Sequence, residues 1–252
     1  MARHRENTQQ QVIADRLQRA ILPAPGGSGG PAGVRVAVRY IPADPGLHIG
    51  GDWYVSARMP DGDLLLSVGD AGGHGIAATT AMTALRHATL GFAATGWPPE
   101  EILAGLNAML CAERGDELAT AVVARFHPQS GELTWSRAGH PPMLLANRAG
   151  ATTLDQPAGS ILGVWPEARF GSASRRLDRG DVVLLYTDGF VERPGRTVDE
   201  GVRALGRQVG DLLPGAGDAG RDAIGRLVRG LRRVNRRDDA CVLAAQLPRR
   251  GG

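Results

Sequence analysis

The sequence predicts an α+β fold in which most of the sheet is antiparallel. Strand-like runs come in groups along the 252 residues, and helical segments lie between the groups. A doubly wound fold would instead show strands and helices in regular alternation. A chain of this length can bury a substantial core. Its composition, with 42% hydrophobic and 22% charged residues, is typical of a globular protein.

The N-terminal part of the chain separates into two segments. Residues 1–22 carry an apolar stripe at helical spacing, which predicts a helix that ends before Pro23. Residues 23–33 are rich in glycine and proline, which predicts a loop-like connection. We therefore expect a regulatory or dimerising helix over 1–22, a connection over 23–33, and one domain over 34–252.

Alternation of apolar and polar residues marks the first strand of that domain. Val34, Val36, Val38 and Tyr40 point to one side, and the residues between them point to the other. Other apolar runs bounded by turn residues predict further strands. These runs are Ile49–Val55, Leu64–Gly69, Ala119–His127, Leu133–Ala138, Met143–Ala146, Asp181–Tyr186 and Ala240–Leu247.

Helical spacing of apolar residues predicts the helices of the domain. Two prolines and then Glu100 and Glu101 mark one start, because proline suits the first turn and acidic residues suit the helix dipole there. The last segment places its apolar residues on one face. The predicted helices are Ile76–Leu90, Pro98–Cys111, Asp199–Leu213 and Asp218–Val234.

Composition argues against several classes of protein. Cys111 and Cys241 are far apart and form neither a metal-ligand pair nor a disulfide framework. No apolar run approaches the ~18–20 residues of a membrane helix, and the N-terminus lacks a signal-peptide core, so we expect no membrane association and a cytoplasmic location. With aromatic residues at 4% and no recognisable motif, we expect no nucleic-acid partner.

Four aspartates stand at the ends or starts of strand-like runs: Asp52, Asp70, Asp188 and Asp238. Carboxylates brought together must either raise their pKa values or share a cation. Oxygen ligands suit Mg²⁺ or Mn²⁺, and two such ions about 3.5–4 Å apart can activate a water for attack on phosphorus. Aspartate beside glycine is also typical of turns, the interpretation we give to Asp61, Asp63, Asp155 and Asp181.

Eight strings in order resemble the metal-dependent (PPM-type) Ser/Thr protein phosphatases, in their bacterial SpoIIE/RsbU-like branch. They are ADRLQRAILP, VRYIPAD, GGDWY, GDAGGHG, LATAVVARF, SGELTWSRAGHPPMLL, DVVLLYTDGFVE and RRDDACVL. Each string alone is weak evidence for the family, but the occurrence of all eight in this order is specific. Together the strings extend over nearly the whole chain. The resemblance implies an αββα sandwich of two mostly antiparallel sheets flanked by helices.

The resemblance also implies a site with two divalent cations, Mn²⁺ or Mg²⁺. Asp70 would bridge the ions, and Asp52 with the backbone carbonyl of Ala71 would serve one of them. Asp188 and Asp238 would serve the other, and a metal-bridging water would attack phosphorus directly. Asp239 is the less favoured ligand of the Asp238–Asp239 pair.

Two histidines and one departure complete the site expectations. His74, in a glycine-rich loop before a helix, is a candidate acid or base, although a loop-fixing role is as compatible with the sequence. His140 lies in a proline-rich connection and is interpreted as structural. Relatives often carry aspartate where this chain has Val55, which removes a carboxylate for any third metal.

The expected function is hydrolysis of phosphoserine or phosphothreonine on a protein. By resemblance, the substrate is a small phosphorylated anti-sigma-factor antagonist in a partner-switching circuit. Two alternatives stay open: a module that binds and sequesters a signalling partner with little catalysis, and a phosphatase acting on small phosphorylated metabolites. Binding that survives metal removal would indicate the first alternative, and assays across substrates would separate the second.

Overall fold

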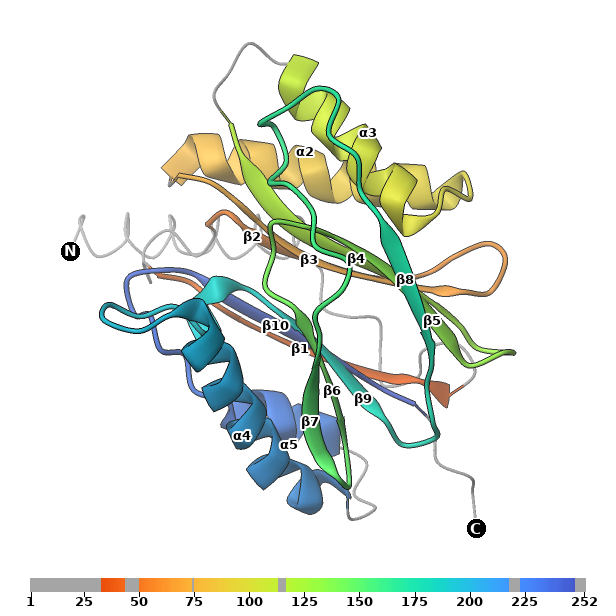
Figure 1. Cartoon of the computed structure of the whole chain (residues 1–252), viewed down its shortest axis with the longest axis vertical. Helices are drawn as coiled ribbons and strands as arrows, with labels where there is room; N and C mark the ends of the chain where they lie inside the picture. Colours follow the sequence, from red (N-terminus) through yellow and green to blue (C-terminus); the bar gives the residue numbers. More distant parts are fainter. Residues whose placement is uncertain (1–32, 44–49, 74, 113–116, 218–222, 248–252) are drawn as a thin grey trace, which may run out of the picture.

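Two antiparallel sheets packed face to face, with helices on both outer faces, form the structure (Figure 1). This computed structural model describes residues 33–43, 50–73, 75–112, 117–217 and 223–247. All pairings between neighbouring strands within the two sheets are antiparallel. The α+β class and the αββα sandwich predicted from the sequence are therefore confirmed.

The first sheet has five strands in the order β1-β10-β9-β6-β7. Its central strands are almost wholly apolar because both of their faces are covered. The strands are β1 (Arg35–Ile41), β6 (Met143–Asn147), β7 (Gly150–Leu154), β9 (Val182–Tyr186) and β10 (Ala240–Gln246). Helices α4 (Val198–Gly217) and α5 (Ala223–Gly230) cover its outer face (Figure 1).

The second sheet also has five strands, in the order β2-β3-β4-β5-β8. Its strands are β2 (Asp52–Arg58), β3 (Leu64–Ala71), β4 (Ala119–His127), β5 (Glu132–Ala138) and β8 (Ser172–Arg176). Helices α2 (Gly75–Ala94) and α3 (Pro99–Ala112) lie on its outer face. A short 3₁₀ helix, η2 (Asp188–Phe190), follows β9 directly.

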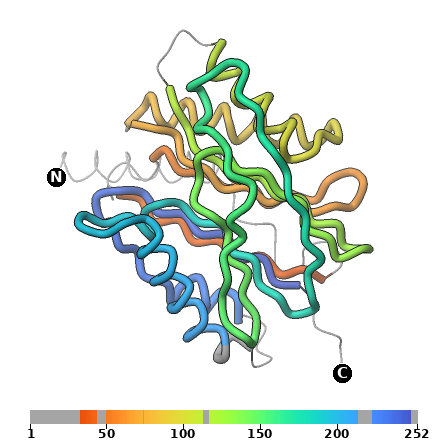
Figure 2. Tube along the Cα trace, in the orientation of Figure 1, coloured from red at the N-terminus to blue at the C-terminus, as the bar shows by residue number. Residues whose placement is uncertain are grey.

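The two ends of the described chain meet in the first sheet. Strand β1 pairs with β10 from Arg35 opposite Gln246 to Ile41 opposite Ala240. Figure 2 shows this as an orange-red strand lying along a blue one. The pairing brings the start of β10, and with it Asp238, to the same end of the sandwich as the residues that follow β1.

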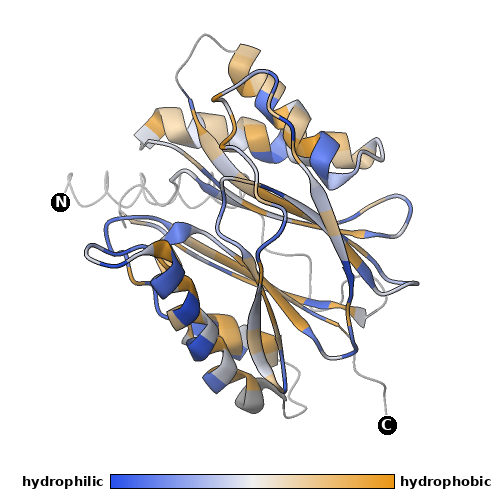
Figure 3. Ribbon diagram, in the orientation of Figure 1, coloured by the Kyte–Doolittle hydropathy of each residue, from blue (hydrophilic) through white to orange (hydrophobic). Residues whose placement is uncertain are grey.

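Two groups of buried apolar residues hold the layers together. One fills the space between the sheets and reaches α2 and α3, with Trp53, Leu66 and Leu243 among its members. The other lies between the first sheet and helices α4 and α5, with Leu184 and Leu205 among its members. In Figure 3 the central strands of the first sheet are coloured largely as hydrophobic, whereas the edge strand β8 is not.

The predicted elements differ from the structure in a few places. Strands β7 and β8 were not predicted, because both are edge strands without an apolar alternation. The last helix ends at Gly230 rather than Val234, and the side chain of Arg39 donates to the carbonyls of Arg229 and Leu231 there. Strand β2 spans Asp52–Arg58, so Gly50 and Gly51 of the predicted Ile49–Val55 strand are not part of it.

Some predictions lie outside the described residues. These are the 1–22 helix and all but the last residue of the 23–33 connection. Both cysteines are free thiols, Cys241 buried and Cys111 half-buried, as expected for a chain without disulfides. None of the helices in the described part of the chain combines the length and apolar character that crossing a bilayer requires.

Candidate metal centre

The four predicted aspartates gather at one end of the sandwich, two from each sheet. Asp52 begins β2 and Asp70 lies near the end of β3, where their Cα atoms are cross-strand partners. Asp188 follows β9, and Asp238 precedes β10, which is the neighbour of β9. Strand ends place the four side chains on firm backbone, as a preorganised site requires.

Burial and mutual repulsion disfavour ionisation of the two carboxyls of the second sheet. Asp52 is only 2% exposed, and burial followed by the charge of Asp70 raises its pKa well above the ordinary value. A hydrogen bond from Thr187 acts in the opposite direction. Burial, then Asp188 and Asp238, raises the pKa of Asp70 to about 8.

The pKa values of the two carboxyls from the first sheet, Asp188 and Asp238, are raised as well. Burial and the nearby charges of Asp238 and Glu192 raise the pKa of Asp188 to about 6. Burial also raises the pKa of Asp238, while Arg233 and a backbone hydrogen bond from Asp239 lower it. The negative charges of the four aspartates therefore repel one another across the two sheets. A cation among them would relieve this repulsion.

Two local features fit a hard cation at this place. The Oδ1 atom of Asp188 is buried and has no hydrogen-bond partner among the described residues, which is costly for a carboxylate oxygen unless another group binds it. A Cβ atom on Gly51 would overlap the carbonyl oxygen of Ala71 and lie 2.9 Å from Asp70 Oδ1. Glycine at 51 thus leaves space beside two of the predicted oxygen ligands.

In the parts of the chain that are described, no group of three or more side chains among aspartate, glutamate, histidine and cysteine has the spacing of a formed metal site. Repulsion among the carboxylates acts to hold them apart when no positive charge lies between them.

Asp239 is engaged by the backbone around the site. Its Oδ1 atom accepts a hydrogen bond of 2.8 Å from the amide of Ala43, and its carboxyl group lies against Gly50. The amide of Gly50 donates to the hydroxyl of Tyr40 at 2.9 Å. These contacts favour Asp238 over Asp239 as the ligand, because the Asp239 carboxyl already contacts the backbone at Ala43 and Gly50.

The two histidines of the sequence analysis have different outcomes. His74 lies outside the described residues, so its role stays a prediction. His140 is buried, and its ring joins the sheets: Nδ1 lies 2.8 Å from Thr120 Oγ1 and Nε2 lies 3.0 Å from the carbonyl of Tyr186. Burial lowers its pKa to about 3, which keeps the ring neutral and gives it a structural role.

Sequence reasoning missed three residues that support the site. Tyr40 holds Gly50 as described above, and Arg233 donates to the carbonyls of Pro42 (3.0 Å) and Asp238 (3.1 Å). Thr187 donates to Asp52 Oδ2 at 2.7 Å. Of the three, only Thr187 could have been found from the sequence, because its hydroxyl-bearing side chain directly precedes the predicted ligand Asp188 in the DVVLLYTDGF string.

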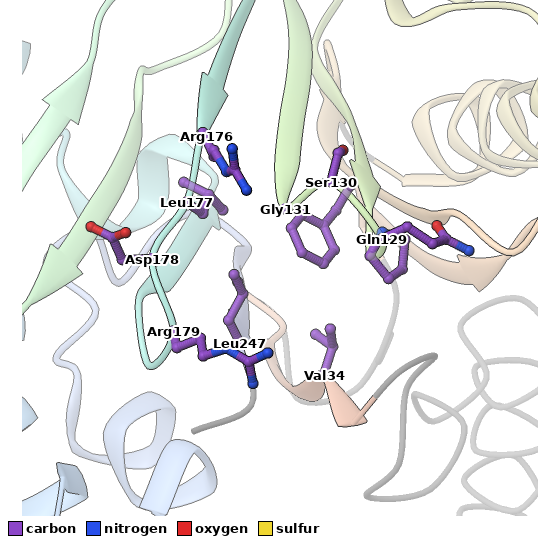
Figure 4. A pocket seen from close by; sticks show the side chains of 11 residues that line it. Val34, Gln129, Ser130, Gly131, Arg176, Leu177, Asp178, Arg179 and Leu247 are labelled. Atoms are coloured by element: carbon purple, nitrogen blue, oxygen red, sulfur yellow. The ribbon is translucent and has the colours of Figure 1, made fainter. Parts of the chain in front are cut away.

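A cavity of about 540 Å³ opens at the opposite end of the sandwich (Figure 4). Phe126, Arg176 and Leu247 are among the residues that line it. Phe126 pairs with Leu64 at the start of β3, whereas Asp70 lies near the other end of that strand. The cavity is therefore separate from the aspartates.

The two-sheet sandwich and the four aspartates at one of its ends match the arrangement that the sequence resemblance implied. The family profile described as Stage II sporulation protein E (SpoIIE) matches residues 60–248. The chain belongs to this family, which confirms the resemblance seen in the sequence.

Individual relatives agree with this assignment. Phosphoserine phosphatase RsbU of Bacillus subtilis is 25% identical over 152 residues, which cover 59% of this chain and 44% of RsbU. The solved RsbU and RsbW domains of Rv1364c from Mycobacterium tuberculosis share 32% identity at a TM-score of 0.75, over 85% of this chain and 60% of that one. The chain thus spans less than two thirds of both relatives.

A more distant structure has the same fold and contains metal. The catalytic domain of the serine/threonine phosphatase PstP, in complex with two manganese ions, superimposes with a TM-score of 0.59 at 16% identity. The match covers 86% of this chain and 99% of PstP's. At this identity the likeness establishes the fold, and the ions are a property of PstP.

Proposed function

We propose that this chain is a metal-dependent protein serine/threonine phosphatase. Its two divalent ions, Mg²⁺ or Mn²⁺, would be held by Asp52, Asp70, the carbonyl of Ala71, Asp188 and Asp238. The observation that carries the proposal is the meeting of four acidic side chains from two sheets, which raise one another's pKa values at one end of the sandwich. Membership of the SpoIIE family supports the same function.

Each group of the site has a separate task in this proposal. Bound ions supply Lewis acidity and activate water for attack on the phosphorus atom. Asp70, which interacts with Asp188 and Asp238 across the sheets, joins the two halves of the site. Gly51 keeps space open beside the Ala71 carbonyl, and Arg233 holds the backbone carbonyl of Asp238.

We propose a phosphorylated protein as the substrate, in a partner-switching circuit that controls a sigma factor. Support comes from the relatives: one is named a phosphoserine phosphatase, and another carries RsbU and RsbW domains in one chain. A small anti-sigma-factor antagonist carrying phosphoserine is the expected partner.

The deciding experiment is hydrolysis of p-nitrophenyl phosphate in EDTA, Mg²⁺ and Mn²⁺, comparing the wild type with Asp70→Asn. The proposal expects turnover that needs the metal and falls by at least about a hundredfold in the variant, because a ligand common to both ions is lost. Circular dichroism of the variant checks that it is folded. Equal turnover in EDTA and Mn²⁺, or an Asp70→Asn variant as active as the wild type, would overturn the metal-dependent mechanism.

A further inference from the structure

The side chain of Thr187 lies at the junction of the two sheets, beside the aspartates. It is completely buried at 0% exposure. Its hydroxyl donates to Asp52 Oδ2 at 2.7 Å and accepts from the amide of Cys241 at 2.8 Å. The amide of Thr187 itself donates to the carbonyl of Cys241 at 2.9 Å. The residue is thus anchored to β10 and reaches across to β2.

These partners fix the direction of the hydroxyl proton. A hydroxyl has one proton to donate, and the Cys241 amide already occupies one of its lone pairs. Two acceptors are within reach of this proton, Asp52 Oδ2 at 2.7 Å and the carbonyl of Cys241 at 3.5 Å, and the much shorter distance directs it to Asp52. The hydroxyl holds Oδ2 and so sets the orientation of the whole carboxylate.

We infer that Thr187 is a positioning residue of the metal centre, whose hydroxyl orients the Asp52 carboxylate and links the ligands of one sheet to those of the other. This inference rests on the proposed metal-dependent function. Thr187 directly precedes Asp188, so one backbone segment carries a ligand of one ion and steers a ligand of the other. Groups that orient metal ligands in this way typically contribute 10–100-fold to metal affinity.

A graded series of substitutions separates this role from simple packing. Thr187→Ser keeps the hydroxyl, Thr187→Cys offers a weak thiol donor, and Thr187→Val keeps the shape without any donor. Mn²⁺ affinity, measured by isothermal titration calorimetry on the full chain, is expected to fall in that order. We expect a change below about threefold for Ser and a loss of about tenfold or more for Val.

Thr89→Val is the matched control. Thr89 is also 0% exposed, and its hydroxyl donates at 2.8 Å to the carbonyl of Leu85 within α2, away from the aspartates. The same chemical change there should leave Mn²⁺ affinity at the wild-type value, even if it lowers the melting temperature. A fall in affinity that is equal in Thr89→Val and Thr187→Val would show general destabilisation and overturn the inference.

The outcomes distinguish this inference from the proposed function. A wild type that binds no Mn²⁺ contradicts the metal-dependent function itself. A wild type that binds Mn²⁺, with equal affinity in all three Thr187 variants, contradicts only the positioning role. If Thr187→Val does not fold, the comparison of Thr187→Ser with Thr187→Cys decides. The inference expects a higher Mn²⁺ affinity in Thr187→Ser, and equal Mn²⁺ affinities in these two variants would overturn it.

Discussion

Asp52 and Asp70 stand directly opposite each other on neighbouring antiparallel strands, with their Cα atoms in register. Like charges at opposed positions of an antiparallel pair are destabilising. Here both carboxyls are also largely withdrawn from water, which raises the pKa of each. The metal-free protein therefore stores repulsion at the place where, in our proposal, the ions bind.

The first prediction follows from this repulsion. Asp70→Asn removes one charge of the pair, so in EDTA at pH 8 the variant should be more stable to urea than the wild type, by about 1–3 kcal/mol. The same substitution removes a proposed metal ligand and should abolish Mn²⁺-dependent turnover. An Asp70→Asn protein that unfolds at lower urea than the wild type in EDTA would show that the repulsion is unimportant.

The second prediction concerns the space at Gly51. Alanine there would push its Cβ into the carbonyl of Ala71 and against Asp70, so the site must shift. Displacements of about 1 Å can cost a hundredfold in rate, and we expect Gly51→Ala to lose at least about tenfold in Mn²⁺-dependent turnover of p-nitrophenyl phosphate.

Gly91→Ala is the control for this substitution. Gly91 lies inside α2 with nothing within 4 Å of its added Cβ, so alanine should keep full activity and raise stability by up to about 1 kcal/mol. If Gly51→Ala keeps the turnover of the wild type, the claim that a Cβ atom at position 51 displaces the Ala71 carbonyl and Asp70 is wrong.

The third prediction is a pH dependence that comes from His140. Its pKa is lowered to about 3 in the folded protein, against about 6.5 in an unfolded chain. The unfolded state therefore binds the proton first, and the stability contributed by the neutral ring is lost as the pH falls below 6.5. Between pH 7.5 and pH 5 this loss should amount to about 2 kcal/mol of unfolding free energy.

Urea denaturation of the wild type and of His140→Gln at the two pH values tests this. The variant is expected to be less stable at pH 7.5, because its amide cannot reproduce both bonds of the ring to Thr120 and Tyr186. It should also lose less stability on acidification than the wild type does. Parallel pH profiles for the two proteins would show that His140 is not the titrating group.

The fourth prediction concerns metal removal. A ligand that binds only the folded state stabilises it by about 2.7 kcal/mol at a free concentration one hundred times its dissociation constant. Mn²⁺ should therefore raise the urea midpoint of the wild type, and EDTA should reverse the effect. Asp188→Asn should show a smaller rise, because it alters the carboxylate whose buried Oδ1 atom has no hydrogen-bond partner in the described part of the chain. An unchanged midpoint in Mn²⁺ would contradict ion binding by the folded state.

Much of the fold was predictable from local patterns. The Ala119–His127 strand was predicted with the bounds that β4 has, because most of its nine residues are apolar and the turn residues of Pro128–Glu132 follow it. Strand β8 was missed because its sequence, SASRR, is mostly exposed at a sheet edge and has no apolar face. Edge strands gain their structure from the hydrogen bonds of a neighbour, and those bonds leave no trace in the local sequence.

The sequence by itself determined the family and the α+β architecture, because the order of apolar runs and of eight family-like strings can be read along the chain. Its resemblance to the family also singled out the four strand-end aspartates that lie at one end of the sandwich. Only the tertiary structure decided how the acids meet: Asp52 opposite Asp70, and Thr187 bonded to Asp52 across 135 positions of sequence. The physical reason is that strand register and sheet packing are set by long-range contacts. The orientation of a buried carboxylate therefore depends on partners that sequence spacing cannot reveal.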